Sequence, residues 1–183
     1  MLETGRLMLR PFEERDFADV YEYTNLQTAH CFADMRSDGP EAARREMRRR
    51  QKDAECYFAI CLKASGKVIG EVFAYSEQTA PGEAAADTFS PCWMLHPDYQ
   101  GKGYAYEAVR AYFDYLFHHK GARRIYAYTE DNNFPSQRLC EKLGMRREGL
   151  FLEYVTFVSK PDGTPLYENT VQYAILKREW LAL

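Results

Sequence analysis

Two glycines, Gly101 and Gly103, stand between an apolar stretch and a stretch with helical periodicity. The apolar stretch covers residues 92–95, and the helical pattern begins at Ala105. Glycine lacks a Cβ atom, so its backbone can adopt a positive φ and approach a ligand closely. The N–H groups and the dipole at a helix N-terminus favour a negative charge in such a turn. The sequence therefore predicts a binding site for a pyrophosphate group.

Two widespread phosphate-binding turns do not match this stretch. The P-loop requires a Ser or Thr after its Gly-Lys pair, but Gly103 follows Lys102, so no hydroxyl is placed for Mg²⁺. The dinucleotide fingerprint requires a third glycine, and Tyr106 occupies that position. These mismatches disfavour a nucleotide hydrolase and indicate another kind of pyrophosphate turn.

Composition restricts the class of protein further. The 183 residues are 46% hydrophobic and 28% charged, which is typical of one soluble domain spanning residues 1–183. A net charge of −3 gives no reason to expect a nucleic acid or an anionic membrane as partner. No stretch approaches the roughly 18 apolar residues of a membrane helix. The five cysteines are odd in number and form no C-x-x-C, so we expect neither a disulfide framework nor a bound metal. The N-terminal residues do not show the pattern of a signal peptide, and we therefore expect a cytoplasmic protein.

The elements that must position the turn follow from hydrophobic periodicity. It predicts an α/β (α+β) fold, in which helices flank a mixed, mostly antiparallel central sheet. Strands are expected at residues 7–12, 57–62, 68–75, 88–95, 124–129, 150–158 and 166–176, and helices from residue 16 onward and at 40–53, 105–120 and 135–143. Residues 76–87 are small and polar and predict a loop. The six basic residues in 40–53 are interpreted as a solvated helix face rather than a docking surface, because acidic residues are interspersed.

The glycine turn matches the pattern Q-x-x-G-x-A, written here Gln100-Gly101-Lys102-Gly103-Tyr104-Ala105. This run resembles the coenzyme A pyrophosphate loop of the GNAT superfamily of N-acetyltransferases. The order of the expected strands and helices is similar to the GNAT fold over nearly the whole chain. The sequence segments at residues 2–10 and 148–176 resemble those of the superfamily branch that includes ribosomal-protein N-terminal alanine acetyltransferases.

A second motif lies at Asn133 and Ser136, which match the N-x-x-S hallmark of the same superfamily. From residue types alone, Asn133, Pro135 and Ser136 predict the start of a helix. The resemblance implies in addition that Asn133 contacts the pantetheine arm of the coenzyme. A capping role and a ligand contact are compatible.

The resemblance implies that an acetyl group moves from acetyl-CoA to a primary amine by direct attack on the thioester. The amine must first lose a proton, because an ammonium with a pKa of roughly 8 to 10 is not a nucleophile. The developing oxyanion needs a donor, implied to be a backbone N–H within residues 93–95. The coenzyme-binding residues implied are Trp93, Met94, Leu95, Gln100, Gly101, Lys102, Gly103, Tyr104, Ala105, Asn133 and Ser136.

The sequence motifs identify the general acid for the leaving thiolate and the general base for the amine less directly. Many superfamily members have a Tyr four residues after the motif serine, where this chain has Cys140. We interpret Cys140 as a small core residue, so Ser136 is the better candidate to assist the leaving thiolate. Glu71 and Glu153 are candidate bases, because burial on a strand would make a carboxylate more basic, although both positions also suit solvent-facing side chains. Glu168 is a third candidate.

Several alternatives stay open at this point. His96 precedes Pro97, so a role in the turn is expected rather than a role as base. Cys140 in place of Tyr motivates a second hypothesis, a catalytically weak coenzyme A-binding sensor or regulatory module. The acceptor amine, a protein N-terminus or a small molecule, cannot be read from the sequence. A homodimer formed through edge strands near the C-terminus is also left open.

Overall fold

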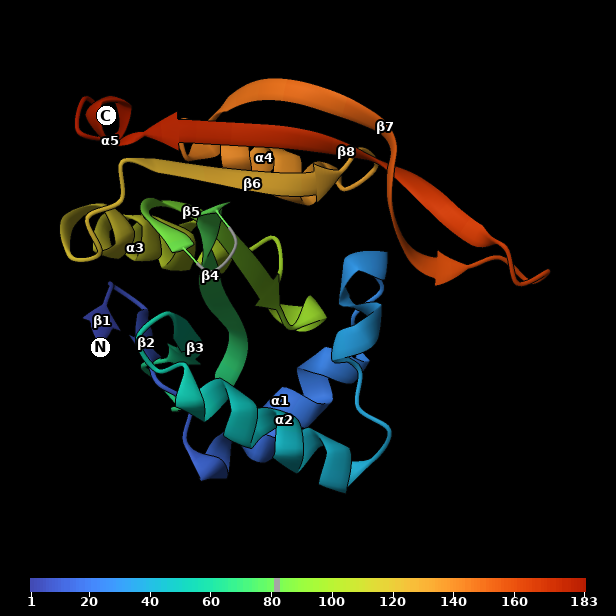
Figure 1. Ribbon diagram of the computed structural model, residues 1–183. Helices are drawn as coiled ribbons and strands as arrows, with labels where there is room; N and C mark the ends of the chain where they lie inside the picture. Colours follow the sequence, from blue (N-terminus) through green and yellow to red (C-terminus); the bar gives the residue numbers. More distant parts are fainter. Residues whose placement is uncertain (81–82) are drawn as a thin grey trace. The chain divides into compact units, whose positions relative to one another are not determined.

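The computed structural model describes residues 1–80 and 83–183 (Figure 1). The strands are β1 (Leu2–Glu3), β2 (Leu7–Arg10), β3 (Tyr57–Leu62), β4 (Val68–Ala80), β5 (Glu83–Leu95), β6 (Arg124–Glu130), β7 (Arg146–Ser159) and β8 (Pro165–Leu176). The α-helices are α1 (Phe17–Asn25), α2 (Pro40–Lys52), α3 (Tyr104–His118), α4 (Phe134–Lys142) and α5 (Lys177–Trp180). Short 3-10 helices cover Glu14–Asp16, His30–Met35 and Pro97–Tyr99.

The strands form one eight-stranded sheet in the order β1-β2-β3-β4-β5-β6-β8-β7. The pairs β1–β2, β2–β3, β3–β4, β6–β8 and β7–β8 are antiparallel, and β5–β6 is parallel. Parallel neighbours need a crossover connection, which α3 provides between β5 and β6. The predicted α/β fold with a mixed, mostly antiparallel sheet is confirmed.

The loop predicted at residues 76–87 is wrong for most of its length. Residues 76–80 continue β4 and residues 83–87 begin β5, whereas residues 81–82 lie outside the described part of the chain. Strand formation depends on backbone pairing with a neighbour as well as on side-chain type. Small and polar residues next to a paired strand therefore extend it. The hairpin predicted from strands 57–62 and 68–75 is confirmed by the antiparallel pairing of β3 and β4.

The chain divides into two compact units. The first unit comprises Met1–Thr28, Phe32–Ala74 and Cys92–Tyr115. The second unit comprises Ala29–Cys31, Tyr75–Pro91 and Leu116–Leu183.

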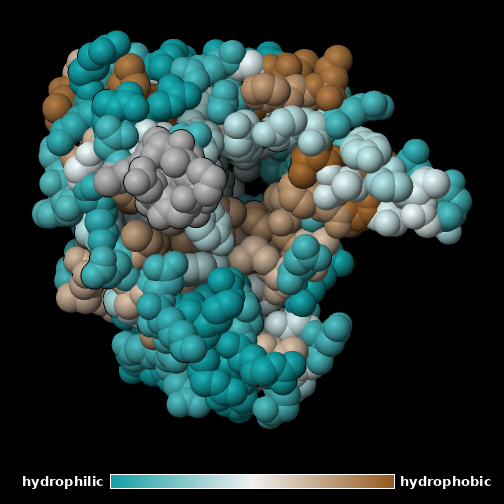
Figure 2. All heavy atoms as spheres, viewed as in Figure 1, coloured by the Kyte–Doolittle hydropathy of each residue, from teal (hydrophilic) through white to brown (hydrophobic). Residues whose placement is uncertain are grey.

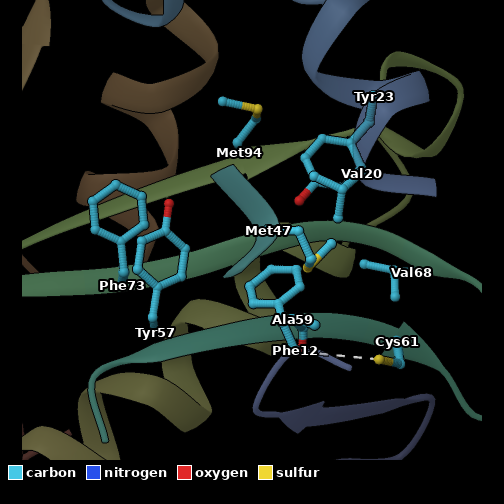
Figure 3. Packing of buried hydrophobic residues seen from close by; sticks show 10 residues of the cluster. All are labelled: Phe12, Val20, Tyr23, Met47, Tyr57, Ala59, Cys61, Val68, Phe73 and Met94. Carbon is cyan, nitrogen blue, oxygen red and sulfur yellow. Dashed lines mark hydrogen bonds between the residues drawn. The ribbon is translucent and has the colours of Figure 1, made fainter. Parts of the chain in front are cut away.

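The first unit has an apolar core between β3, β4 and the helices α1 and α2 (Figure 3). Ten buried side chains form its centre: Phe12, Val20, Tyr23, Met47, Tyr57, Ala59, Cys61, Val68, Phe73 and Met94. Tyr57 stacks on Phe73 with ring centroids 4.2 Å apart, and its edge meets Phe12 at 5.8 Å. Aromatic pairs of this kind add to the free energy gained by burial.

The solvated-face interpretation of helix 40–53 is wrong for one residue. Arg50 of α2 is only 1% exposed and forms an ion pair with Glu71 of β4. Its neighbour Arg49 is exposed and pairs with Glu46 one turn earlier, as the interspersed acids predicted. The sequence pattern could not separate the two, because consecutive arginines on a helix point in different directions.

The second unit contains the antiparallel set β6–β8–β7 together with α4 and α5. β7 ends the strand order, and large apolar side chains are exposed along it and its hairpin partner: Leu150, Phe151, Leu152, Tyr154, Phe157 and Tyr167. Figure 2 shows hydrophobic residues at the surface along this hairpin. Among the described residues, no helix has both the length and the apolar character needed to cross a membrane.

Gly70 is required for the close approach of β4 and β5. A Cβ atom at this position would lie 2.2 Å from the carbonyl oxygen of Met94, and that oxygen belongs to the backbone and cannot rotate away. We expect Gly70→Ala to lower the free energy of unfolding by about 3 kcal/mol or more, measured by urea denaturation.

Gly149→Ala on β7 is the matched control, because its added Cβ would meet Phe151 at 3.5 Å, an ordinary contact. The control should stay within about 1 kcal/mol of the parent protein. Equal effects of the two substitutions would contradict the assigned role of Gly70.

Candidate functional site

The glycine turn follows β5 and leads into α3, as predicted. His96 opens it, because its Nδ1 accepts a hydrogen bond from the backbone N–H of Asp98 at 3.1 Å. The expected turn role of His96 is thereby confirmed. Gly101 and Gly103 have φ angles of 71° and 82°, a region that side-chain-bearing residues avoid. The first backbone hydrogen bond of α3 runs from Glu107 to the carbonyl of Gly103, so earlier N–H groups point out of the helix start.

An N-terminal segment fixes this turn from one side. Arg6 forms an ion pair with Glu107 in the first turn of α3, with 2.7 Å between Nε and Oε2. Its Nη1 donates to the carbonyl of Lys102 at 3.1 Å, and its guanidinium lies 4.2 Å from the centroid of the Tyr104 ring. Thr4 donates to the same carboxylate at 2.6 Å. The turn is thus held by contacts with residues about 100 positions earlier in the chain.

Glu107 remains ionised in this arrangement. Partial burial on its own raises the pKa of Glu107, but the hydrogen bonds from Thr4 and Arg6 lower it below the usual value. A carboxylate near a helix N-terminus is also favoured by the helix dipole. The turn therefore contains a fixed ion pair on one side and the exposed side chain of Lys102.

The end of β5 is held by two side-chain amides. Gln27 and Gln100 both donate to the carbonyl oxygen of Leu95, at 3.1 and 3.2 Å. Met94 and Leu95 are buried, and Trp93 is partly buried. The end of this strand is consequently held by two side-chain donors, within the residues where the resemblance implies an oxyanion donor.

Glu71 lies in the first unit and is fully buried. Its Oε2 accepts hydrogen bonds from the hydroxyl of Tyr23 at 2.6 Å and from Nε of Arg50 at 2.9 Å. Its Oε1 accepts from the hydroxyl of Tyr57 at 2.9 Å and from Nη2 of Arg50 at 3.3 Å. Both carboxylate oxygens are therefore engaged by donors from α1, α2 and β3.

The partners of Glu71 all keep their protons. Burial raises the pKa of Tyr23 and of Tyr57 well above the usual value, and the charge of Glu71 adds to the rise. Burial on its own lowers the pKa of Arg50, but the charge of Glu71 raises it above the usual range. The cluster is thus one buried ion pair with two neutral hydroxyl donors.

The second sequence motif begins α4 in the second unit. Asn133 caps the helix as predicted, because its Oδ1 accepts from the backbone N–H of Ser136 at 3.3 Å. Pro135 follows in the first turn. Cys140 is completely buried, and burial raises the pKa of its thiol to about 12. This environment agrees with the interpretation of Cys140 as a core residue.

The motif is part of a larger polar network at the ends of β6 and β8. Glu130 accepts from Nδ2 of Asn133 and, through its other oxygen, from the backbone N–H of Cys31, both at 3.1 Å. Next to Cys31, Nδ1 of His30 lies 2.9 Å from Oε1 of Glu168. No sequence pattern indicates the contacts of Cys31 and His30, since these join residues 99 and 138 positions apart.

Glu153 belongs to the same region. Asn169 donates to Asp131 at 2.8 Å and accepts from the backbone N–H of Glu153 at 2.9 Å. Glu153 has a φ of 47° and an exposed side chain, at an irregularity of the β7–β8 pairing. The structure therefore groups Asn133, Ser136 and Glu153 in the second unit, and the glycine turn and Glu71 in the first.

Metal ligands are not grouped in the described part of the chain. Within residues 1–80 and 83–183, no three His, Cys, Asp or Glu side chains are placed so that they could hold a metal ion.

Known proteins resemble this chain along nearly its whole length. Residues 6–146 match the family described as Acetyltransferase (GNAT) domain. The uncharacterized N-acetyltransferase YnaD of Bacillus subtilis is 33% identical over 179 residues, covering 98% of each chain. A GNAT-family acetyltransferase from Bacillus anthracis has a TM-score of 0.82 at 28% identity, covering 97% of this chain and 99% of that one. The ribosomal-protein-S5-alanine acetyltransferase of Vibrio fischeri shares the fold, with a TM-score of 0.72, 21% identity and 97% coverage of each chain.

The chain is an acyltransferase and belongs to the GNAT family of acetyltransferases. The resemblance drawn from the glycine turn and the Asn133–Ser136 motif is confirmed for the family. The roles of the individual site residues stay predictions.

Glu71 permits a test that separates a structural role from a role as base. Glu71→Gln keeps the shape but removes the buried counter-charge of Arg50, whose remaining carboxylate partner is the partly exposed Glu46, 3.2 Å from Nη1. We expect the free energy of unfolding in urea to fall by about 3 to 5 kcal/mol. Glu22→Gln is the control, because Glu22 is half exposed and pairs with Lys67 at the surface, and it should cost less than about 1 kcal/mol.

A Glu71→Gln protein as stable as the parent would contradict the structural role. The kcat of the folded variant then addresses the candidate base. A fall of about 100-fold or more would support Glu71 as base, and a value close to the parent's would exclude it.

Proposed function

We propose that this enzyme is an acetyl-CoA-dependent N-acetyltransferase that acetylates a primary amine by direct attack on the thioester. The observation that carries this proposal is the turn containing Gly101 and Gly103, held at the start of α3 by the Arg6–Glu107 ion pair. The pyrophosphate of the coenzyme would accept hydrogen bonds from the N–H groups of this turn. Lys102 would add a positive charge, and Gln100, Tyr104 and Ala105 would complete the loop.

The remaining roles follow the family pattern. A backbone N–H within residues 93–95 would donate to the oxyanion, in a strand whose end is held by Gln27 and Gln100. Asn133 would contact the pantetheine arm. Ser136 would donate a hydrogen bond to the leaving thiolate. Glu71 and Glu153 are carried forward as candidate bases.

We propose only the general class of the acceptor amine, the cell compartment and the oligomeric state of the enzyme. The acceptor is a protein N-terminus or a small-molecule amine. The odd number of cysteines supports a reducing cytoplasm. A homodimer would use β7, since this strand ends the sheet order and exposes apolar side chains.

Cys140 favours a second candidate, a coenzyme A-binding sensor with little activity, because its buried thiol replaces the usual tyrosine. The two candidates differ in one measurement. The protein is incubated with acetyl-CoA and a panel of amines while the free thiol of coenzyme A is followed. Thiol release that depends on an amine supports the enzyme, whereas tight coenzyme binding without release supports the sensor.

Gly103→Val tests the placement of the coenzyme. The substituted backbone would be strained at a φ of 82°, and the side chain would block the approach of the pyrophosphate. We expect the affinity for coenzyme A to fall by about 100-fold, or about 2.7 kcal/mol, in calorimetry. Gly163→Val in the turn between β7 and β8 is the control, since its φ is 85° and nothing lies within 4 Å of the added Cβ. Equal affinities of the two variants would overturn the placement.

Ser136 and Cys140 are distinguished by kinetics. Ser136→Ala should lower kcat about 10-fold and leave the affinity for acetyl-CoA unchanged, because the hydrogen bond strengthens in the transition state. Cys140→Ala should leave kcat within about threefold and lower the free energy of unfolding by about 1 kcal/mol, as removal of a small buried side chain does. The reverse pattern would assign the leaving-group role to Cys140.

A further inference from the structure

His30 and Glu168 form a hydrogen-bonded pair that the roles assigned so far do not use. Nδ1 of His30 lies 2.9 Å from Oε1 of Glu168, in residues 138 positions apart in sequence. The side chain of His30 is 42% exposed, and that of Glu168 is only 11% exposed. The pair thus joins a mostly buried carboxylate to an imidazole that solvent and ligands can reach.

The carboxylate determines which ring nitrogen is available. An ionised Glu168 accepts a hydrogen bond from Nδ1–H, and this fixes the tautomer in which Nε2 carries the lone pair. The other oxygen, Oε2, is buried and has no hydrogen-bond partner among the described residues. The carboxylate therefore has His30 as its partner, and the ring is oriented with Nε2 directed away from it.

The pair is connected to the motif of α4. The backbone N–H of Cys31, next to His30, donates to Glu130, which in turn accepts from Asn133. Asn133 accepts from the backbone of Ser136. His30 is therefore held in one hydrogen-bonded network with the two residues that the proposed function puts at the pantetheine arm and the thioester sulfur.

We propose that His30, oriented by Glu168, is the catalytic base that takes the proton of the acceptor amine. The inference rests on the proposed function. The amine nitrogen forms a bond to the carbonyl carbon of the acetyl group while Nε2 of His30 takes its proton. The C–S bond breaks, its electron pair goes to sulfur, and the thiolate takes a proton from solvent. The imidazolium returns its proton to solvent.

The other carboxylates of the unit suit this role less well. Glu168 is mostly buried and engaged by His30, so it acts as a positioning residue. Glu153 is exposed at a strand irregularity, and Glu130 accepts hydrogen bonds with both oxygens. Beside Glu168, the titratable groups that the hydrogen bonds of this segment bring next to His30 are the carboxylate of Glu130 on β6 and the thiol of the adjacent Cys31.

The test uses the full chain, acetyl-CoA and a panel of amines comprising peptides with N-terminal Ala, Ser or Met, free lysine and a polyamine. On the amine that the parent uses best, His30→Gln should lower kcat about 100-fold and remove the acidic limb of the kcat–pH profile. The KM for acetyl-CoA and the thermal unfolding midpoint should stay unchanged. Glu168→Gln should lower kcat about 10-fold, since the amide still accepts from Nδ1–H but carries no charge.

Two controls separate a base from a merely structural side chain. His118→Gln, at the exposed C-terminal end of α3, removes another histidine and should leave kcat and the pH profile unchanged. Added imidazole should restore part of the activity of His30→Ala, which a structural loss would not allow.

The outcomes distinguish the two proposals. If His30→Gln keeps kcat within about threefold and the same pH profile, while Gly103→Val weakens coenzyme binding about 100-fold, His30 is not the base but the proposed function stands. If the parent releases no coenzyme A thiol with any amine of the panel, the proposed function fails and the role of His30 fails with it. A loss of kcat in His30→Gln with a lowered unfolding midpoint and no rescue by imidazole would also overturn the assignment.

Discussion

An ionised carboxylate inside an apolar core must be matched by hydrogen bonds and by an opposite charge, and this requirement at Glu71 organises the first unit. The side chain is fully buried, and its two oxygens accept four hydrogen bonds. Tyr23 comes from α1, Arg50 from α2 and Tyr57 from β3, so one carboxylate ties two helices to the sheet. Loss of any of these donors leaves a charge or a polar atom without compensation.

The residue before this carboxylate sets the second constraint. Gly70 lets β4 approach the carbonyl of Met94, where any Cβ atom would overlap with backbone. The position of β5 relative to β4 then determines where the glycine turn begins, since His96 donates its backbone N–H to Ile69. Two adjacent residues, Gly70 and Glu71, therefore position both the helices and the strand that leads into the glycine turn.

Features that depend on residues close together in the chain were predicted from the sequence. The glycines of the turn and the cap at Asn133 require special dihedral angles or donors, and their residue types reveal them. The periodicity of β3 was predicted at its observed bounds, residues 57–62. Each of these features depends on residues within a few positions of one another.

Contacts between segments that are far apart in the chain have no corresponding pattern in the sequence. Arg50 was interpreted as part of a solvated helix face because acidic residues are interspersed in residues 40–53, yet its guanidinium reaches Glu71 on β4. Arg6 and Glu107 stand about 100 positions apart, so nothing in the sequence links them before the chain folds. The extension of β4 into residues 76–80 and of β5 into residues 83–87 likewise depends on pairing rather than on composition.

The proposed function must account for the absence of a tyrosine at position 140. A coenzyme thiolate is the conjugate base of a thiol with a pKa of about 8.5, so it can leave near neutral pH with little help from an acid. The acceptor starts as an ammonium of roughly similar or higher pKa, and it cannot attack until a proton has been removed. With its pKa raised to about 12 by burial, the thiol of Cys140 is a poor proton donor. The harder proton transfer is therefore on the amine, where a positioned base contributes more than an acid at the sulfur.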